Sequence, residues 1–388
     1  MTDEAIKSKF GDILPFSAAR KRYNRGELST GSVAFDFLIN GGFHLGQCSC
    51  LWGPTGCGKT TSLMIAIGQA LAKNPTRTAL FIDLDLGLNP DYGARTAQAS
   101  ASIVKPLIDK AMFDKKKGLW VVKDDNGIEL KFSQESYEQT ANYAKNLAKA
   151  IEDKLYWIGR KPGEVLQDII LEQITINKHQ IIVIDPQDEI YPSSRFNVSD
   201  KEDQGKRAKY LGDFSAIIKH AVADYDTAIV YTSQMRTGRG QNYSYPDMTG
   251  GNRFRHNMDL IVRYGNPKVE SFDVSGKQML GQTVALSVEP GSRSCPSTFK
   301  TDKPKIGTGS YINARLIYGY GWDNDFALME LGEYLQTIEA NGSYYSWIDK
   351  GGEVWRGHGR SAFLEAVRAA DRYEELWDNI LKKPEVLD

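Results

Sequence analysis

The chain has 388 residues, of which 41% are hydrophobic and 25% are charged, a composition typical of a globular protein. The formal net charge of −1 excludes a protein that binds nucleic acid with its whole surface, so any such contact has to be a local patch. No apolar run is long enough to span a bilayer, and the polar segment 1–9 does not resemble a signal peptide, so we expect no membrane contact and a cytoplasmic location.

The first residues predict a short helix at 5–10, followed by an extended segment. A positive cluster lies in that segment and consists of Arg20, Lys21, Arg22 and Arg25. The cluster is either the solvated face of an arm or a segment that docks on a neighbouring subunit. The run Ser29-Thr30-Gly31-Ser32 then opens a helix at 33–38, which Gly41-Gly42 ends.

A phosphate-binding loop follows a short apolar strand at 49–52. It reads G-x-x-x-x-G-K-T and comprises Gly53, Pro54, Thr55, Gly56, Cys57, Gly58, Lys59 and Thr60, followed by Thr61. The motif functions only between a strand and a helix, and the next residues continue as a helix. Backbone N–H groups and the helix N-terminus would bind phosphates, Lys59 would reach the β- and γ-phosphates, and Thr60 would hold Mg²⁺. The sequence therefore predicts binding of a nucleoside triphosphate, which Cys57 would make sensitive to thiol reagents.

The next strand, 78–83, ends in the acidic residues Asp83 and Asp85 and completes a parallel strand–helix–strand unit. Residues 94–153 then predict a helix–hairpin–helix insertion. Its parts are a helix at 101–112, a hairpin of 119–123 with 128–132, and a helix at 133–153. The basic run 115–117 is either a solvated turn or an extra contact with DNA or a partner.

A helix at 164–174 leads to the apolar strand 180–185, which ends in Asp185. An aspartate at this place is the second signature of a nucleotide site, where it would hold the Mg²⁺ shell through water. Residues 195–207 lack periodicity and predict a loop. A helix at 208–225 and a strand at 227–232 follow, with Gln234 just past the strand end.

Residues 235–249 are rich in Gly, Tyr and Arg. They are too irregular for a regular element and too long for an ordinary connection, which favours a functional loop. The remaining predicted elements are strands at 260–264, 283–288 and 313–318, helices at 327–340 and 361–381, and a hairpin of 344–348 with 353–355.

In this order, the motifs resemble the RecA-type homologous recombinases from about Phe10 to Lys382, with one break at the insertion. The resemblance is carried by Ser29-Thr30-Gly31-Ser32, Gly41-Gly42, the phosphate loop, Phe81 to Asp85, Leu88 to Tyr92, Gln234, Gly250-Gly251-Asn252 and Leu316 to Gly319. It implies an α/β fold, a RecA-like P-loop NTPase core with a mostly parallel sheet flanked by helices. The implied parts are an N-terminal arm that docks on subunits (1–28), the core (29–324, with the insertion at about 94–153) and a small α+β C-terminal lobe (325–388).

The resemblance also implies an ATP- and Mg²⁺-dependent recombinase that functions in DNA repair. Such a protein forms helical filaments of identical subunits on single-stranded DNA, promotes strand exchange with homologous duplex DNA, and works with single-strand-binding and mediator proteins. By the same resemblance, Asp85 would orient the attacking water and Gln234 would sense the γ-phosphate. The further nucleotide contacts would be Asn89, Tyr92, Tyr318 and, across the subunit interface, Arg293.

The two predicted loops fall where this family binds DNA. The candidate DNA-binding residues are Arg195, Asn197, Lys206, Arg207, Arg236, Arg239, Tyr243, Tyr245, Gly250, Gly251, Asn252 and Arg253. The arginines would meet phosphates. The tyrosines would either stack on bases or only pack within the loop.

Four departures from the family pattern leave alternatives open. Asp85 stands where the family has glutamate, so we expect slower hydrolysis. Only Arg293 remains as a candidate contact across the subunit interface, the long N-terminal helix of the family is shortened, and the insertion is not part of the bacterial pattern. Together they suggest a divergent or virus-encoded relative acting in the host cytoplasm. The alternatives are a ring-forming helicase or regulatory ATPase with the same core, and a non-catalytic accessory protein that coats DNA.

Overall fold

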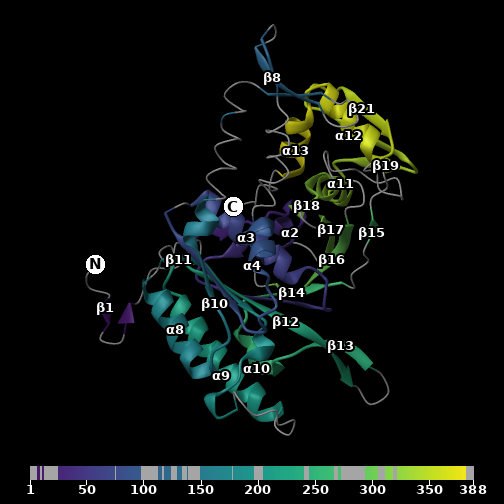
Figure 1. Cartoon of the computed structure of the whole chain (residues 1–388). Helices are drawn as coiled ribbons and strands as arrows, with labels where there is room; N and C mark the ends of the chain where they lie inside the picture. Colours follow the sequence, from purple (N-terminus) through teal and green to yellow (C-terminus); the bar gives the residue numbers. More distant parts are fainter. Residues whose placement is uncertain are drawn as a thin grey trace.

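The protein is built around a central sheet that lies between two sets of helices (Figure 1). This computed structural model describes residues 7–8, 11–12, 25–74, 76–97, 112–115, 118–123, 129–132, 138, 149–176, 178–195, 204–239, 244–265, 270–271, 293–304, 311–317 and 321–381. The predicted α/β fold, with a mostly parallel sheet flanked by helices, is confirmed. Among the described helices, none has the length and apolar character needed to cross a membrane.

The sheet is parallel over most of its width. In order across the sheet, the parallel strands are β10 (Leu155–Ile158), β6 (Thr78–Asp83), β11 (His179–Asp185), β12 (Ala228–Arg239), β5 (Cys48–Gly53) and β14 (Leu260–Tyr264). The sheet continues with the antiparallel strands β16 (Arg293–Pro304), β17 (Tyr311–Ile317) and β18 (Gly321–Trp322), while β13 (Ser244–Met248) pairs with β12 and β15 (Glu270–Ser271) with β16. The later parallel strands lie on both sides of β5, with β12 on one side and β14 on the other. Ligands of open α/β sheets bind at the carboxyl ends of strands beside such a point.

Successive side chains of each strand enter different cores because they point to opposite faces of the sheet. On β6, Phe81 packs into one core and Ile82 into the other. The helices of the first face are α2 (Val33–Leu38), α3 (Lys59–Lys73) and α4 (Pro90–Ala97), and those of the second are α8 (Gly163–Ile176), α9 (Gln204–Val222) and α10 (Gly251–Asn257). Both faces of the parallel part are therefore covered.

A buried polar turn precedes β5. The Asp36 carboxylate accepts hydrogen bonds from the Thr30 N–H at 2.8 Å and from the Thr30 hydroxyl at 2.7 Å. Burial raises the pKa of Asp36 to about 6. Ser32 caps α2 by accepting from the Phe35 N–H, and the helix has the bounds 33–38 that the sequence predicts. Next to this turn, β3 (Glu27–Leu28) pairs with β4 (Phe43–His44).

The C-terminal segment packs on the first core through α11 (Asn324–Tyr334). The Asn324 side chain accepts from the Val33 N–H at 3.1 Å and donates to the Gly31 carbonyl at 3.2 Å. The elements beyond it are β19 (Glu339–Asn341), β20 (Tyr344–Ile348), β21 (Val354–His358), α12 (Arg360–Ala369) and α13 (Tyr373–Leu381). The predicted hairpin here is confirmed as the pair β20 and β21.

Three predicted helices are wrong. In place of the helix at 5–10, β1 (Lys7–Ser8) pairs with β2 (Gly11–Asp12). The helix predicted for 327–340 ends at Tyr334, since Gln336 adopts a left-handed φ of 57°, and the chain then enters β19. The helix predicted for 361–381 is two helices, because Asp371 between them has a φ of 58°.

The insertion contains the predicted hairpin, formed by β8 (Leu119–Lys123) and β9 (Glu129–Phe132). A strand that was not predicted, β7 (Met112–Asp114), pairs with β8. The sequence predicted that Met112 ends a helix, and this is wrong because Met112 lies in β7. The rest of the predicted helix 101–112 and the predicted strand 283–288 lie outside the described residues. The edge strand β10 was also missed, and its Tyr156 and Trp157 are half-exposed.

Candidate functional site

The phosphate loop joins β5 to α3 through turns that favour glycine. Gly56 and Gly58 have φ values of 77° and 91°, in the left-handed region. A Cβ on Gly58 would lie 2.9 Å from Cδ2 of Leu316, whereas a Cβ on Gly56 would meet no atom within 4 Å. Gly58 is therefore fixed by packing against β17, while Gly56 faces open space.

Lys59 is the first residue of α3. Its ammonium group donates hydrogen bonds to the carbonyl oxygens of Gly53 at 3.0 Å and Pro54 at 2.9 Å. The positive charge therefore lies on the inner side of the loop, beside the N-terminus of a 15-residue helix. This arrangement of loop backbone, helix dipole and ammonium suits a polyphosphate.

Asp185, at the end of β11, faces the start of α3. The Thr60 hydroxyl donates to its Oδ2 at 2.6 Å, and the Thr232 hydroxyl donates to its Oδ1. Burial raises the pKa of Asp185 above its ordinary value although both hydrogen bonds act to lower it, and the Asp85 charge raises it further. Thr232 was not singled out in the sequence, because only the pairing of β11 with β12 brings it here.

The acidic end of β6 lies beside Asp185, since Asp83 is its register partner. The Gly87 N–H donates to Asp83 at 3.2 Å and to Asp85 at 3.0 Å, so one turn holds both carboxylates. Burial, together with the neighbouring Asp85, raises the pKa of Asp83. Asp85 itself is exposed, and its position leaves it accessible to a water molecule.

The structure describes only some of the other residues predicted to contact the nucleotide. Asn89 is exposed and directly precedes α4, on which Tyr92 lies, but the Tyr92 side chain is not described. Cys57 is buried in the loop, with its Sγ 3.7 Å from the Lys59 ammonium. Arg293 begins β16 with an undescribed side chain, and Tyr318 lies outside the described residues.

These residues fit a nucleoside triphosphate with Mg²⁺. The open space at Gly56 and the Lys59 ammonium suit phosphate oxygens. The oxygen atoms of Thr60 and Asp185 are the donors that Mg²⁺ prefers. Within the described part of the chain, no group of three or more His, Cys, Asp and Glu side chains forms a metal site.

The second predicted loop is wrong in its structure. Residues 235–239 continue β12 beyond the parallel sheet, and they pair antiparallel with β13. Gln234 therefore lies within a strand, in register with Gly53 of the phosphate loop. The root of the β12–β13 hairpin thus adjoins the nucleotide site.

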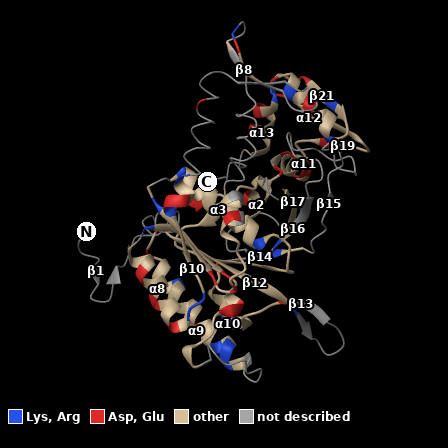
Figure 2. Ribbon diagram, in the orientation of Figure 1, with Lys and Arg blue, Asp and Glu red and all other residues tan. Residues whose placement is uncertain are grey.

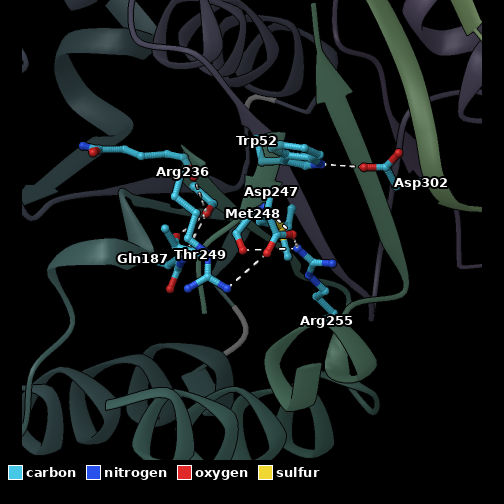
Figure 3. Close-up of polar contacts among 11 residues, drawn as sticks. Trp52, Gln187, Arg236, Asp247, Met248, Thr249, Arg255 and Asp302 are labelled. Atoms are coloured by element: carbon cyan, nitrogen blue, oxygen red, sulfur yellow. Dashed lines mark hydrogen bonds and ion pairs between the residues drawn. The ribbon is translucent and has the colours of Figure 1, made fainter. Parts of the chain in front are cut away.

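Arg236, near the root of the hairpin, is already ion-paired. Its guanidinium lies 3.1 Å from Oδ2 of Asp247, and Arg255 of α10 contacts Oδ1 of the same carboxylate (Figure 3). Arg236 remains 47% exposed. Figure 3 also shows Trp52, directly before the phosphate loop, donating to Asp302 at 2.8 Å.

The first predicted loop is partly helical, because α9 begins at Gln204. Lys206 is exposed on its first turn. Arg207 donates to the Asp188 carbonyl, and its guanidinium lies 4.6 Å from the centre of the Tyr191 ring. The predicted DNA contact Arg207 is thus tied to the segment that follows β11.

The remaining DNA candidates lie at several places. Gly250 and Gly251, with φ values of 99° and 76°, lead into α10, where Asn252 is exposed and Arg253 is ion-paired with Asp213. Figure 2 shows basic and acidic residues interspersed, with basic positions near α9 and α10. The candidates without described side chains are Arg195, Arg239 and Tyr245, and those outside the described residues are Asn197 and Tyr243.

Curated proteins resemble the chain over most of its length, although no protein-family model matches it. RecA of Thermotoga neapolitana is 24% identical over 364 residues, which are 92% of this chain and 83% of that protein. RecA of Francisella tularensis subsp. novicida is 23% identical over 377 residues, which are 95% of this chain and 84% of that protein. These similarities over about nine tenths of the chain support its assignment as a divergent member of the RecA-type family.

One polar cluster of the protein was missed in the sequence. Next to Asp188, hydroxyl and amide side chains join the segment after β11 to both ends of the hairpin, and the members are Gln187, Ser233 and Thr249. The acidic run after Asp185 was the available signal, but contacts over 46 to 62 residues of sequence carry no local pattern.

Proposed function

We propose that the protein is an ATP-dependent DNA recombinase that forms helical filaments on single-stranded DNA and promotes pairing and strand exchange with homologous duplex DNA. The observation that carries the proposal is the course of β12. This strand places Gln234 in register with Gly53 of the phosphate loop and then leaves the sheet as one arm of a hairpin that bears Arg236. Nucleotide and DNA would therefore be sensed by one continuous strand.

In the proposed ATPase, Lys59 binds phosphate oxygens, and Thr60 and Asp185 hold Mg²⁺. When bound, Mg²⁺ would neutralise phosphate charge and favour attack on the γ-phosphate. Asp85 orients the attacking water, and Gln234 reports the presence of the γ-phosphate to the hairpin. Aspartate is shorter than glutamate by one methylene, so we expect turnover to be slow.

DNA binding would rest on local charge and not on the net charge of −1. The exposed Arg236, together with Lys206 on α9, would meet phosphates of a single strand. The segment 1–28 as a docking arm, the division of the chain into arm, core and C-terminal lobe, and the help of single-strand-binding and mediator proteins belong to the same proposal.

The test is ATP hydrolysis with and without long single-stranded DNA, combined with electron microscopy of the same mixtures. We expect DNA to stimulate turnover and helical filaments to form with ATP. Lys59→Ala, which removes the phosphate-binding ammonium, should abolish both. Closed rings that unwind duplex ends would instead indicate a helicase, and filaments without turnover would indicate a DNA-coating accessory protein.

A further inference from the structure

A buried carboxylate lies between the nucleotide site and the hairpin. Asp188 belongs to the short helix η2 (Gln187–Glu189), which begins two residues after Asp185. Its side chain is 7% exposed. A carboxylate buried this deeply needs hydrogen-bond donors, and its donors come from both arms of the hairpin.

The two oxygens of Asp188 are divided between the two arms. Oδ2 accepts from the backbone N–H of Gln234 on β12 at 2.8 Å, and Oδ1 accepts from the hydroxyl of Thr249, directly after β13. The carbonyl oxygen of Asp188 accepts from Arg207 on α9. One residue therefore contacts both candidate DNA-binding segments and the backbone of the proposed γ-phosphate sensor.

The hydroxyl hydrogens have a defined order in this cluster. Gln187 Nε2 donates to Ser233 Oγ at 3.0 Å and to Thr249 Oγ1 at 2.7 Å. Since the Thr249 proton is used on Asp188, Ser233 is the donor in the 2.7 Å contact between the two hydroxyls, and its hydroxyl has the Gln234 carbonyl oxygen at 3.4 Å as a second acceptor. The bonds from Gln187 and Ser233 to Thr249 therefore continue to the Asp188 carboxylate through the Thr249 hydroxyl.

The cluster is not fully satisfied. Gln187 is completely buried, and its Oε1 has no hydrogen-bond partner among the described residues. Exchanging the amide oxygen and nitrogen would only leave a donor unpaired in place of an acceptor. An unpaired buried polar atom is costly, so it narrows the free-energy gap between this arrangement and any other that would pair it.

We propose that Asp188 is a positioning residue that couples the nucleotide site to both DNA elements by holding Gln234, Thr249 and Arg207 to the segment after Asp185. A shift of Gln234 toward a γ-phosphate would then move the far arm of the hairpin and α9 as well. This inference rests on the proposed function, because it requires that nucleotide and DNA bind to the same chain.

The experiment measures the affinity of the full-length protein for fluorescent single-stranded oligonucleotide with and without a non-hydrolysable ATP analogue. The ratio of the two affinities is the coupling. In the unsubstituted protein we expect a coupling of about tenfold or more. Thr249→Val keeps the side-chain shape but removes the hydroxyl. In this variant, the DNA affinities with and without nucleotide should differ by no more than about twofold, while the affinity for nucleotide stays unchanged.

Thr249→Ser, which keeps the hydroxyl, is the matched control and should retain the coupling. Asp188→Ala should lose it, and the double variant should lose no more than either single variant if the two residues act as a unit. Ser233→Ala is a milder second variant in case Thr249→Val does not fold, and it should also lower the coupling. Thermal unfolding of each variant tests folding independently.

The outcomes separate the two proposals. Coupling that survives in both Thr249→Val and Ser233→Ala would overturn the role of Asp188 and leave the proposed function intact. No effect of nucleotide on DNA affinity in the unsubstituted protein would overturn the proposed function, and the coupling role with it. Equal loss of coupling in Thr249→Ser would show that packing, and not the hydroxyl, holds the hairpin, which also overturns the proposal.

Discussion

Replacing Asp247 with asparagine would release the two arginines that its carboxylate holds. Burial acts to raise the pKa of Asp247, but the hydrogen bonds and charges of Arg255 and Arg236 outweigh it and lower the pKa, so the carboxylate is charged at neutral pH. Arg236 is 47% exposed and lies 3.1 Å from Asp247, so this pair contributes on the order of 1 kcal/mol. In the proposed recombinase, a DNA phosphate would have to overcome that amount to bind Arg236.

Asp247→Asn should therefore strengthen binding of single-stranded DNA by about fivefold, which corresponds to about 1 kcal/mol. The slope of log affinity against log salt should become steeper by about 0.7, the value for one added phosphate contact on a single strand. The assay is fluorescence anisotropy between 50 and 200 mM salt, which brackets physiological ionic strength at about 150 mM. The matched control is Asp226→Asn, which makes the same charge change at the Arg25 ion pair, away from the hairpin.

Weaker binding of DNA by Asp247→Asn, with an unchanged salt slope, would refute this reasoning. It would show that Asp247 is needed to shape the hairpin and does not compete with DNA for Arg236. An equal gain in Asp226→Asn would show that only the net charge matters.

Three further predictions follow from single contacts. Thr232→Val removes a donor from Asp185 and should raise the Mg²⁺ concentration needed for ATP binding by roughly tenfold, measured by Mg²⁺ titration, with Thr232→Ser as the control. Gly68→Ala would place a Cβ 1.9 Å from the Ala97 carbonyl, so α3 and α4 must separate, and the free energy of unfolding should fall by about 2 kcal/mol in urea titrations. Burial lowers the pKa of His179 to about 4, so its neutral form stabilises the fold above about pH 6.5, and stability is lost as pH falls toward 4. Between pH 7 and pH 5 the unsubstituted protein should lose on the order of 1 kcal/mol more than His179→Gln, and equal losses in the two proteins would contradict this assignment.

The sequence predicted the elements whose residues are buried on both faces. Strands β6 and β14 were placed at their observed bounds, because short, mainly apolar runs between turn residues have few other interpretations. The phosphate loop was equally clear, since its glycines and Lys59 have fixed spacing. In both cases, residues that are neighbours in the sequence determine the structure, so a local pattern is enough to predict it.

The hairpin was missed although Met248, at the end of β13, packs in the second core. Residues 235–239 and 244–248 have no apolar alternation, so their pairing depends on the continuation of β12 from the sheet. The contacts of Asp188 and Asp247 were missed for a related reason. They join residues from different strands, and only the register of the sheet decides which polar side chains meet.

Because β12 is continuous from the sheet into the hairpin, a small rotation of the strand at the sheet produces a larger displacement at its far end. Its five residues beyond Gln234 extend about 16 Å from the sheet, at about 3.3 Å per residue. A rotation of about 10° at Gln234 would move the end of β12 by about 3 Å, close to the 3.4 Å rise between stacked bases. In the proposed recombinase, a rotation of this size would be enough to shift the register of a bound strand by about one base.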